Sequence, residues 1–191
     1  MIDKKKTINY VVIRKALSKE LCDFIYNYML IQRDAVDLMM KHNQLNPYNP
    51  FMGTREDKQI PGAYSKYGDW AMEALLVKMI PIMKKKTGLE LIPTYSYTRL
   101  YEKGNILKRH KDRPSCEVST TLHLGGDEWP IFVDPSGQDF VIDEYKNIHK
   151  PGAPKGVRVD LKQGDMLIYA GCELEHWREP FQGNICSQVF L

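Results

Sequence analysis

The stretch YSYTRLYEKGNILKRHKD, residues 95–112, decides the fold of this chain because a period of two begins in it. Tyr95, Tyr97, Arg99 and Tyr101 recur at every second position, and side chains two residues apart lie on one face of a β-strand. No helical pattern interrupts the chain after this stretch. The sequence therefore predicts a strand-rich part that begins near residue 91.

Further short strands are expected downstream of this first one. They are Val118–Leu124, Trp129–Val133, Phe140–Ile142, Val157–Leu161, Met166–Tyr169 and Ile185–Leu191. Glycine- and proline-containing turns separate them, at residues 125–126, 135–137, 151–152 and 164–165. Many short strands with such turns are typical of an antiparallel barrel or sandwich.

Two helices are expected before the strands. Ser18 is a suitable N-cap for the first, whose apolar positions recur at three- and four-residue spacing to about Met40. Asp69 is a suitable N-cap for the second, which Gly88 ends. The segment between them, His42–Ala63, is rich in Asn, Pro and Gly, and we predict that it is a mobile cover over the mouth of a site.

A length of 191 residues suits one domain. We expect a single domain over residues 1–191, in which residues 1–90 supply helical support and the loop and residues 91–191 form the strand core. Helices that come first and strands that follow favour a mainly β fold with the N-terminal helices packed on one sheet.

Composition and charge argue against several classes of protein. None of the four cysteines sits in a CxxC pair, which leaves zinc-ribbon and thioredoxin-like sites without support. No apolar stretch follows the charged start, and no run of about 18 apolar residues is present, so we expect no signal peptide, no membrane partner and a cytoplasmic location. The net charge of +3 is small and spread out, which does not favour nucleic acid as a partner. Nothing in the pattern indicates an oligomeric state.

Metal chemistry is indicated by His110-Lys111-Asp112. On a strand, residues 110 and 112 would present an imidazole and a carboxylate on the same side. A third ligand would complete a 2-His-1-carboxylate face, which leaves positions of a non-haem iron(II) open. His176 is the preferred third ligand and His123 its rival, in a cupin-like arrangement. A chance surface pair is the alternative interpretation of His110 and Asp112.

Basic residues surround these candidate ligands. They are Lys103, Lys108, Arg109, Lys111 and Arg113. The run favours an acidic partner near the metal, although it lacks the interleaved aromatic residues that nucleic-acid recognition uses.

Two segments carry a resemblance to a known family. Tyr101-Glu102-Lys103-Gly104, followed by Leu107 and by His110-Lys111-Asp112, resembles the Y-x-x-G…H-x-D signature of the prolyl 4-hydroxylase-like 2-oxoglutarate/Fe(II) dioxygenases. Gly164–Tyr169, followed by Glu175-His176-Trp177-Arg178, resembles their G-D-x-L-x-F/Y…H segment. Over Tyr95–Glu117 and Gly164–Leu191 the chain looks most similar to members encoded by bacteriophages and marine microbes. A virus-encoded protein that acts in a host cell is one origin that this resemblance allows.

The resemblance implies both a fold and an activity. The fold is a double-stranded β-helix, a jelly-roll or cupin-like barrel. The activity couples oxidative decarboxylation of 2-oxoglutarate by O2 to hydroxylation of a substrate, with Fe(II) as the metal. His110, Asp112 and His176 would be the metal ligands and catalytic residues. A prolyl residue in a peptide is the first candidate substrate, and a small molecule is another.

The chain departs from the family at the residues that hold the distal carboxylate of 2-oxoglutarate. The family places an Arg or Lys there, whereas residues 185–187 of this chain are Ile, Cys and Ser. A buried carboxylate needs a cation, so we expect Arg99, helped by the Tyr101 hydroxyl, or else Arg178, to bind it. The same departure leaves open a catalytically inactive β-helix module that binds a metal or an anionic ligand.

Overall fold

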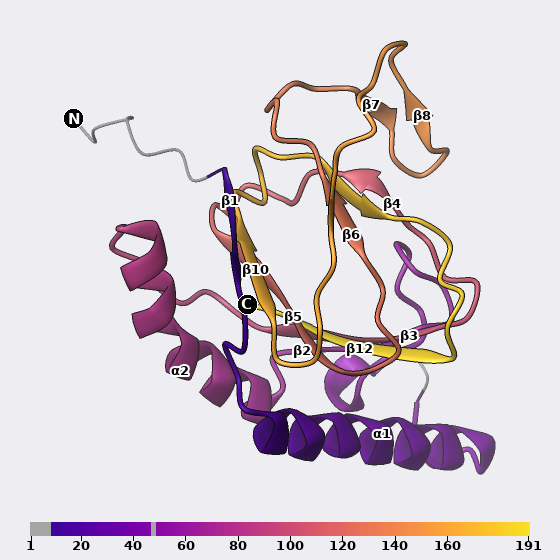
Figure 1. The fold of residues 1–191 in the computed structure, drawn as a ribbon. Coiled ribbons are helices and arrows are strands. Elements are labelled where there is room, and N and C mark those ends of the chain that lie inside the picture. The colour runs from indigo at the N-terminus through magenta and orange to yellow at the C-terminus, as the bar shows by residue number, and fades with distance from the viewer. Residues whose placement is uncertain (1–8, 47–48) are drawn as a thin grey trace.

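Two antiparallel sheets form the core of the chain in the computed structural model, which describes residues 9–46 and 49–191. The larger sheet has the order β1 (Tyr10–Ile13), β10 (Met166–Tyr169), β5 (Ser119–Gly126), β12 (Ile185–Phe190), β3 (Tyr97–Glu102) and β2 (Tyr64–Tyr67). The smaller has the order β4 (Leu107–His110), β11 (His176–Arg178), β6 (Ile131–Val133) and β9 (Val157–Val159). A separate hairpin pairs β7 (Val141–Asp143) with β8 (Ile148–His149) and projects beyond the smaller sheet (Figure 1).

Both helices begin at their predicted N-caps, and the second ends at its predicted glycine. In α1 (Lys19–Lys41) the Ser18 hydroxyl accepts the Leu21 N–H at 3.3 Å. In α2 (Trp70–Thr87) the Asp69 carboxylate accepts the Ala71 N–H at 3.0 Å. Gly88 ends α2 with a φ of 69°, the left-handed conformation that favours glycine.

The helices cover the outer face of the larger sheet (Figure 1). Apolar residues of α1 and α2 form one buried cluster with strand residues that alternate along the sheet. The strand members of this cluster are Ile13, Tyr64, Leu100, Leu122, Leu124, Met166, Ile168 and Val189. The residues between them, such as Tyr101 and Leu167, face the smaller sheet, where a second cluster that includes Ile131 and Val133 lies.

The observed strands confirm the predicted ranges and correct the prediction of where strands begin in the chain. A strand lies within or across each predicted range, usually with shorter ends. The expectation that strands start only after residue 90 is wrong, because β1 and β2 form the two edges of the larger sheet. Each has only four residues, and pairing with β10 and β3 decides its conformation.

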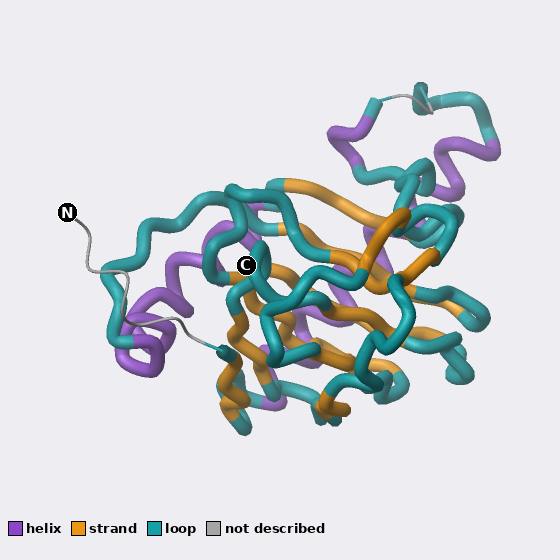
Figure 2. Tube along the Cα trace, turned by 90° about the horizontal axis from the view of Figure 1, so that it is seen from above, coloured by secondary structure: helices purple, strands orange, loops and turns teal. Residues whose placement is uncertain are grey.

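The fold is therefore mainly β, with two facing antiparallel sheets and the helices on one of them: a double-stranded β-helix. Figure 2 shows the strands gathered in the middle of the molecule. In the part of the chain that the structure describes, no helix combines the length and the apolar character that crossing a bilayer needs.

Candidate active site

Three side chains that the sequence proposed as metal ligands meet at one end of the smaller sheet. His110 ends β4, His176 begins β11, and the two are direct register partners. Their Nε2 atoms lie 3.7 and 3.5 Å from Oδ1 of Asp112. One potential ligand atom from each residue lies within 4.8 Å of the other two, so a single ion could contact all three.

Each histidine is held by a backbone carbonyl on its far nitrogen. Nδ1 of His110 lies 2.7 Å from the Lys108 carbonyl, and Nδ1 of His176 lies 2.9 Å from the Leu174 carbonyl. A carbonyl oxygen only accepts, so Nδ1 must carry the proton in both rings. This tautomer leaves both Nε2 lone pairs directed at Asp112 and available to a metal.

Asp112 reaches the site in a different way from the one predicted. It lies two residues beyond the end of β4, so strand alternation does not direct it. Instead its N–H donates to the Gly171 carbonyl at 2.9 Å, and the Ser119 hydroxyl donates to Oδ2 at 2.9 Å. A Cβ on Gly171 would lie 2.4 Å from that Oδ2, so only glycine permits this approach.

Electrostatics keep the Asp112 carboxylate ionised. Burial raises its pKa, but His176 and His110, in the form that carries a proton on Nε2 as well, outweigh burial by their charge and hydrogen bonds and hold the pKa well below its ordinary value. Deprotonated oxygen and neutral imidazole nitrogen are the donor states that a divalent metal needs.

A cavity of about 400 Å³ opens beside the three residues. Tyr95, Tyr97, Arg99 and Tyr101 line it, which places these four predicted neighbours on a common wall. Tyr95 itself precedes the first residue of β3. Asp57 and Gln59, from the segment predicted to cover the site, also line the cavity. Part of that predicted cover, residues 47 and 48, lies outside the described residues.

Arg99 is already paired with an acidic residue of this segment. Its Nη2 lies 2.5 Å from an Asp57 oxygen, and its Nη1 donates to Gln59 at 3.1 Å and to the Tyr101 hydroxyl at 3.2 Å. Burial lowers the pKa of Arg99, yet the adjacent tyrosine hydroxyls and Asp57 raise it by more. The sequence did not indicate the Asp57 pairing, because 42 residues separate the partners.

Arg178 is a different kind of buried cation. Its side chain is completely buried, and its guanidinium donates to the Trp129 carbonyl and, at 3.2 Å, to the Thr121 hydroxyl. Among the described residues it has no acidic partner, and its Nε has no hydrogen-bond acceptor. Burial lowers the pKa of this guanidinium.

His123, the rival ligand, lies apart from the three residues and in contact with other polar groups. Its Nδ1 lies 3.0 Å from Nε2 of Gln188, whose carbonyl accepts the Thr121 hydroxyl at 2.9 Å. Burial and the nearby Arg178 lower the pKa of His123 to about 4. The described histidine, cysteine and acidic residues form one candidate metal cluster, and His123 is not part of it.

Neither a protein-family model nor a curated protein sequence matches this chain. Three solved structures are similar to it over nearly all its length. A Pseudomonas putida prolyl-4-hydroxylase has 18% identity, with 95% of this chain and 90% of that chain covered and a TM-score of 0.59. HygX from Streptomyces hygroscopicus, with nickel, 2-oxoglutarate and hygromycin B bound, has 13% identity, 99% and 86% coverage and a TM-score of 0.63.

The third is the viral collagen prolyl hydroxylase of Paramecium Bursaria Chlorella virus-1, in a 2OG complex. It has 11% identity, covers 96% of this chain and 94% of its own, and has a TM-score of 0.55. Identities this low establish a shared fold, which is the double-stranded β-helix expected from the sequence.

Proposed function

We propose that this chain is an Fe(II)- and 2-oxoglutarate-dependent dioxygenase that hydroxylates a substrate. The observation that carries the proposal is the meeting of His110, Asp112 and His176 at a cavity, with both Nε2 atoms within 3.7 Å of one carboxylate oxygen. Two neutral imidazoles and one carboxylate form the donor set that non-haem Fe(II) oxygenases use. The residues present therefore fit the metal.

Different residues of the chain would bind the metal, orient its ligands and position the substrate. His110, Asp112 and His176 would hold iron, while Lys108, Leu174 and Ser119 keep their donor atoms oriented. Bound Fe(II), 2-oxoglutarate and O2 would supply the oxidising chemistry. The tyrosine-lined wall would orient the substrate and exclude water from the cavity.

The distal carboxylate of 2-oxoglutarate needs a cation, and our preferred candidate is Arg178, which is fully buried and, unlike Arg99, is not among the residues that line the cavity. An unpaired buried guanidinium is costly, and an incoming carboxylate would relieve that cost. Arg178 also follows His176 by two positions on β11, which corresponds to roughly 6.5 Å along a strand. Tyr101 would contribute its hydroxyl, since it lines the cavity. Arg99 remains the second candidate, because binding a ligand there would require Asp57 to leave.

The substrate is the less constrained part of the proposal. We propose a prolyl residue in a peptide first and a small molecule second. Similarity to a prolyl-4-hydroxylase supports the former, and similarity to HygX, solved with hygromycin B bound, supports the latter. We further propose that residues 1–191 act as one domain in a cytoplasm, and that a phage or marine microbial origin accounts for the motif resemblance.

A second candidate function is a catalytically inactive module that binds a metal or an anion. Two observations favour it: residues 185–187 carry no cation, and Asp57 neutralises Arg99. Such a module would bind the metal but not consume 2-oxoglutarate.

Succinate formation from 2-oxoglutarate with Fe(II) and O2 separates the two functions. The unmodified chain should form succinate, and His176→Ala should abolish both succinate formation and tight Co(II) binding. The matched control is His42→Ala, an exposed histidine at the end of α1. Co(II) binding without any succinate, with or without added prolyl peptides, would favour the inactive module.

A further inference from the structure

The residues that directly precede the two histidines form a buried ion pair on the opposite face of the smaller sheet. Arg109 precedes His110 on β4, and Glu175 precedes His176 at the start of β11. Alternation along a strand turns their side chains away from the metal side. Nε of Arg109 donates to Glu175 at 2.6 Å, and the two side chains are only 5% and 1% exposed.

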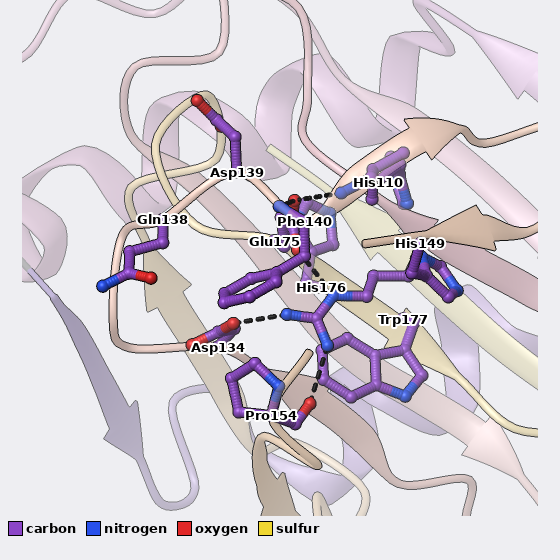
Figure 3. Close-up of polar contacts among 12 residues, drawn as sticks. His110, Asp134, Gln138, Asp139, Phe140, His149, Pro154, Glu175, His176 and Trp177 are labelled. Atoms are coloured by element: carbon purple, nitrogen blue, oxygen red, sulfur yellow. Dashed lines mark hydrogen bonds and ion pairs between the residues drawn. The ribbon is translucent and has the colours of Figure 1, made fainter. Parts of the chain in front are cut away.

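Arg109 makes further contacts that use the rest of its guanidinium. Nη2 donates to the buried Asp134 carboxylate, and Nη1 donates to the Pro154 carbonyl at 2.7 Å. Its guanidinium carbon lies 4.3 Å from the centroid of the Trp177 ring. Figure 3 shows Asp134, Glu175, Pro154 and Trp177 grouped around these contacts. Arg109, one member of the basic run predicted to favour an acidic partner near the metal, therefore takes no part in such binding, since its acidic partners are residues of this chain behind the sheet.

Glu175 connects β11 to the chain segment between β6 and β9, residues 134–156, which carries the β7–β8 hairpin and is called the β7–β8 excursion. Its second carboxylate oxygen accepts the N–H groups of Phe140 at 2.6 Å and Val141 at 2.8 Å. Asp134, at the start of that excursion, accepts the Ser136 N–H at 2.9 Å. Three charged side chains are thus buried with their partners supplied by β4, by β11 and by the residues between 134 and 154.

The register of β4 and β11 depends on few backbone bonds. The strands have four and three residues, and their pairing shifts between His176 and Arg178. A slip of one residue would move a histidine to the other face of the sheet. In the observed register, His110 lies opposite His176, and the residues before them, Arg109 and Glu175, are hydrogen-bonded to each other.

We propose that Arg109, Glu175 and Asp134 are positioning residues for the metal ligands: their ion network holds β4 and β11 in the register that aims both histidines at Asp112. The inference rests on the proposed metal centre. The competing interpretation is that the network only fixes the β7–β8 excursion and contributes stability. The two interpretations differ in their expectation for metal coordination. A positioning role predicts that a variant of the network changes metal coordination, whereas a control variant that loses the same stability does not.

The test compares Glu175→Gln with Asp165→Asn. Glu175→Gln retains an oxygen for the Phe140 and Val141 N–H groups and replaces the oxygen facing Arg109 by a donor. Asp165 is a matched control, because it is also buried and accepts one arginine, Arg14, and two backbone N–H groups. We expect comparable losses of thermal stability in the metal-free proteins.

The readouts are Co(II) affinity and the visible absorption spectrum of bound Co(II), neither of which needs turnover. Glu175→Gln should weaken Co(II) binding by about 10- to 100-fold, the usual effect of losing a group that orients a ligand, and should change the spectrum. Asp165→Asn should change neither. Should Glu175→Gln fail to fold, Arg109→Lys, which keeps the charge and loses the planar fork, serves for the same comparison.

Equal Co(II) affinity and an unchanged spectrum in the Glu175 or Arg109 variant would overturn the positioning role and leave the metal centre intact. Failure of the unmodified chain to bind Co(II) or Fe(II) would overturn the metal centre itself, and the positioning role with it.

Discussion

Arg178 and His176 lie two positions apart on β11. Arg178 is a fully buried cation without an acidic partner among the described residues. Nε2 of His176 lies 3.5 Å from Oδ1 of Asp112. This relationship joins the two halves of the proposed site. A strand that presents a metal ligand also carries, on its next inward position, a charge that a bound carboxylate would neutralise.

Replacing Arg178 by Met should weaken 2-oxoglutarate binding far more than metal binding. Loss of a charge-assisted pair costs about 2–5 kcal/mol, or roughly 1.5 to 3.5 decades in affinity. Calorimetric titration of the Co(II)-loaded protein with 2-oxoglutarate under nitrogen measures this. Arg99→Met is the matched variant and should have the smaller effect, because Asp57 already pairs with Arg99. The reverse order of the two variants would assign the carboxylate to Arg99.

Replacing Gly171 by Ala should reduce metal affinity by about tenfold or more. The added Cβ would lie 2.4 Å from both Asp112 Oδ2 and Ser119 Oγ, so the carboxylate has to move. Gly183→Ala is the control, since its Cβ would meet Asp127 and Phe181 at 2.6–2.7 Å, outside the proposed site. Co(II) titrations of both variants measure the effect. Equal affinities would show that Asp112 tolerates displacement.

Replacing Asp57 by Asn should loosen the segment that reaches the cavity. Asp57 accepts from Arg99 and from the Gln59 N–H at 2.7 Å, and the variant loses the charge that Arg99 requires. Hydrogen–deuterium exchange of residues 54–63 should become faster. Glu56→Gln, a change at an exposed neighbouring position, should leave exchange unaltered. Unchanged exchange in Asp57→Asn would remove the ion pair as the contact that holds this segment closed.

Acidification should destabilise the chain partly through His123. Burial and Arg178 lower its folded-state pKa to about 4, below the ordinary value of 6.5. The folded state therefore binds this proton more weakly than the unfolded state, and stability is lost as pH falls from 6.5 towards 4. A shift of this size corresponds to roughly 3 kcal/mol.

Urea unfolding at pH 7 and pH 4 measures that loss. His123→Gln cannot take up the proton, so its free energy of unfolding should fall less between the two pH values than that of the unmodified chain. His42→Gln, at an exposed position, should behave like the unmodified chain. An identical pH dependence in His123→Gln and the unmodified chain would contradict the assignment.

The helix starts and the strand alternation could be predicted from the sequence, because the interactions that produce them join residues only a few positions apart. Ser18 and Asp69 begin their helices by accepting N–H groups two or three positions ahead. The alternation from Tyr97 to Tyr101 produces a strand whose aromatic face lines the cavity. The proposal that His110, Asp112 and His176 act together came from motif resemblance, since spacing alone left His123 as a rival.

Other features were decided by contacts between distant segments. The edge strands β1 and β2 are too short to be recognised without β10 and β3. Arg99 and Arg109 look alike in the sequence as basic residues near the site, yet one pairs with Asp57 beside the cavity and the other with Glu175 behind the sheet. Which acid meets which arginine depends on sheet register and on the path of loops, and those are set only when the whole chain packs.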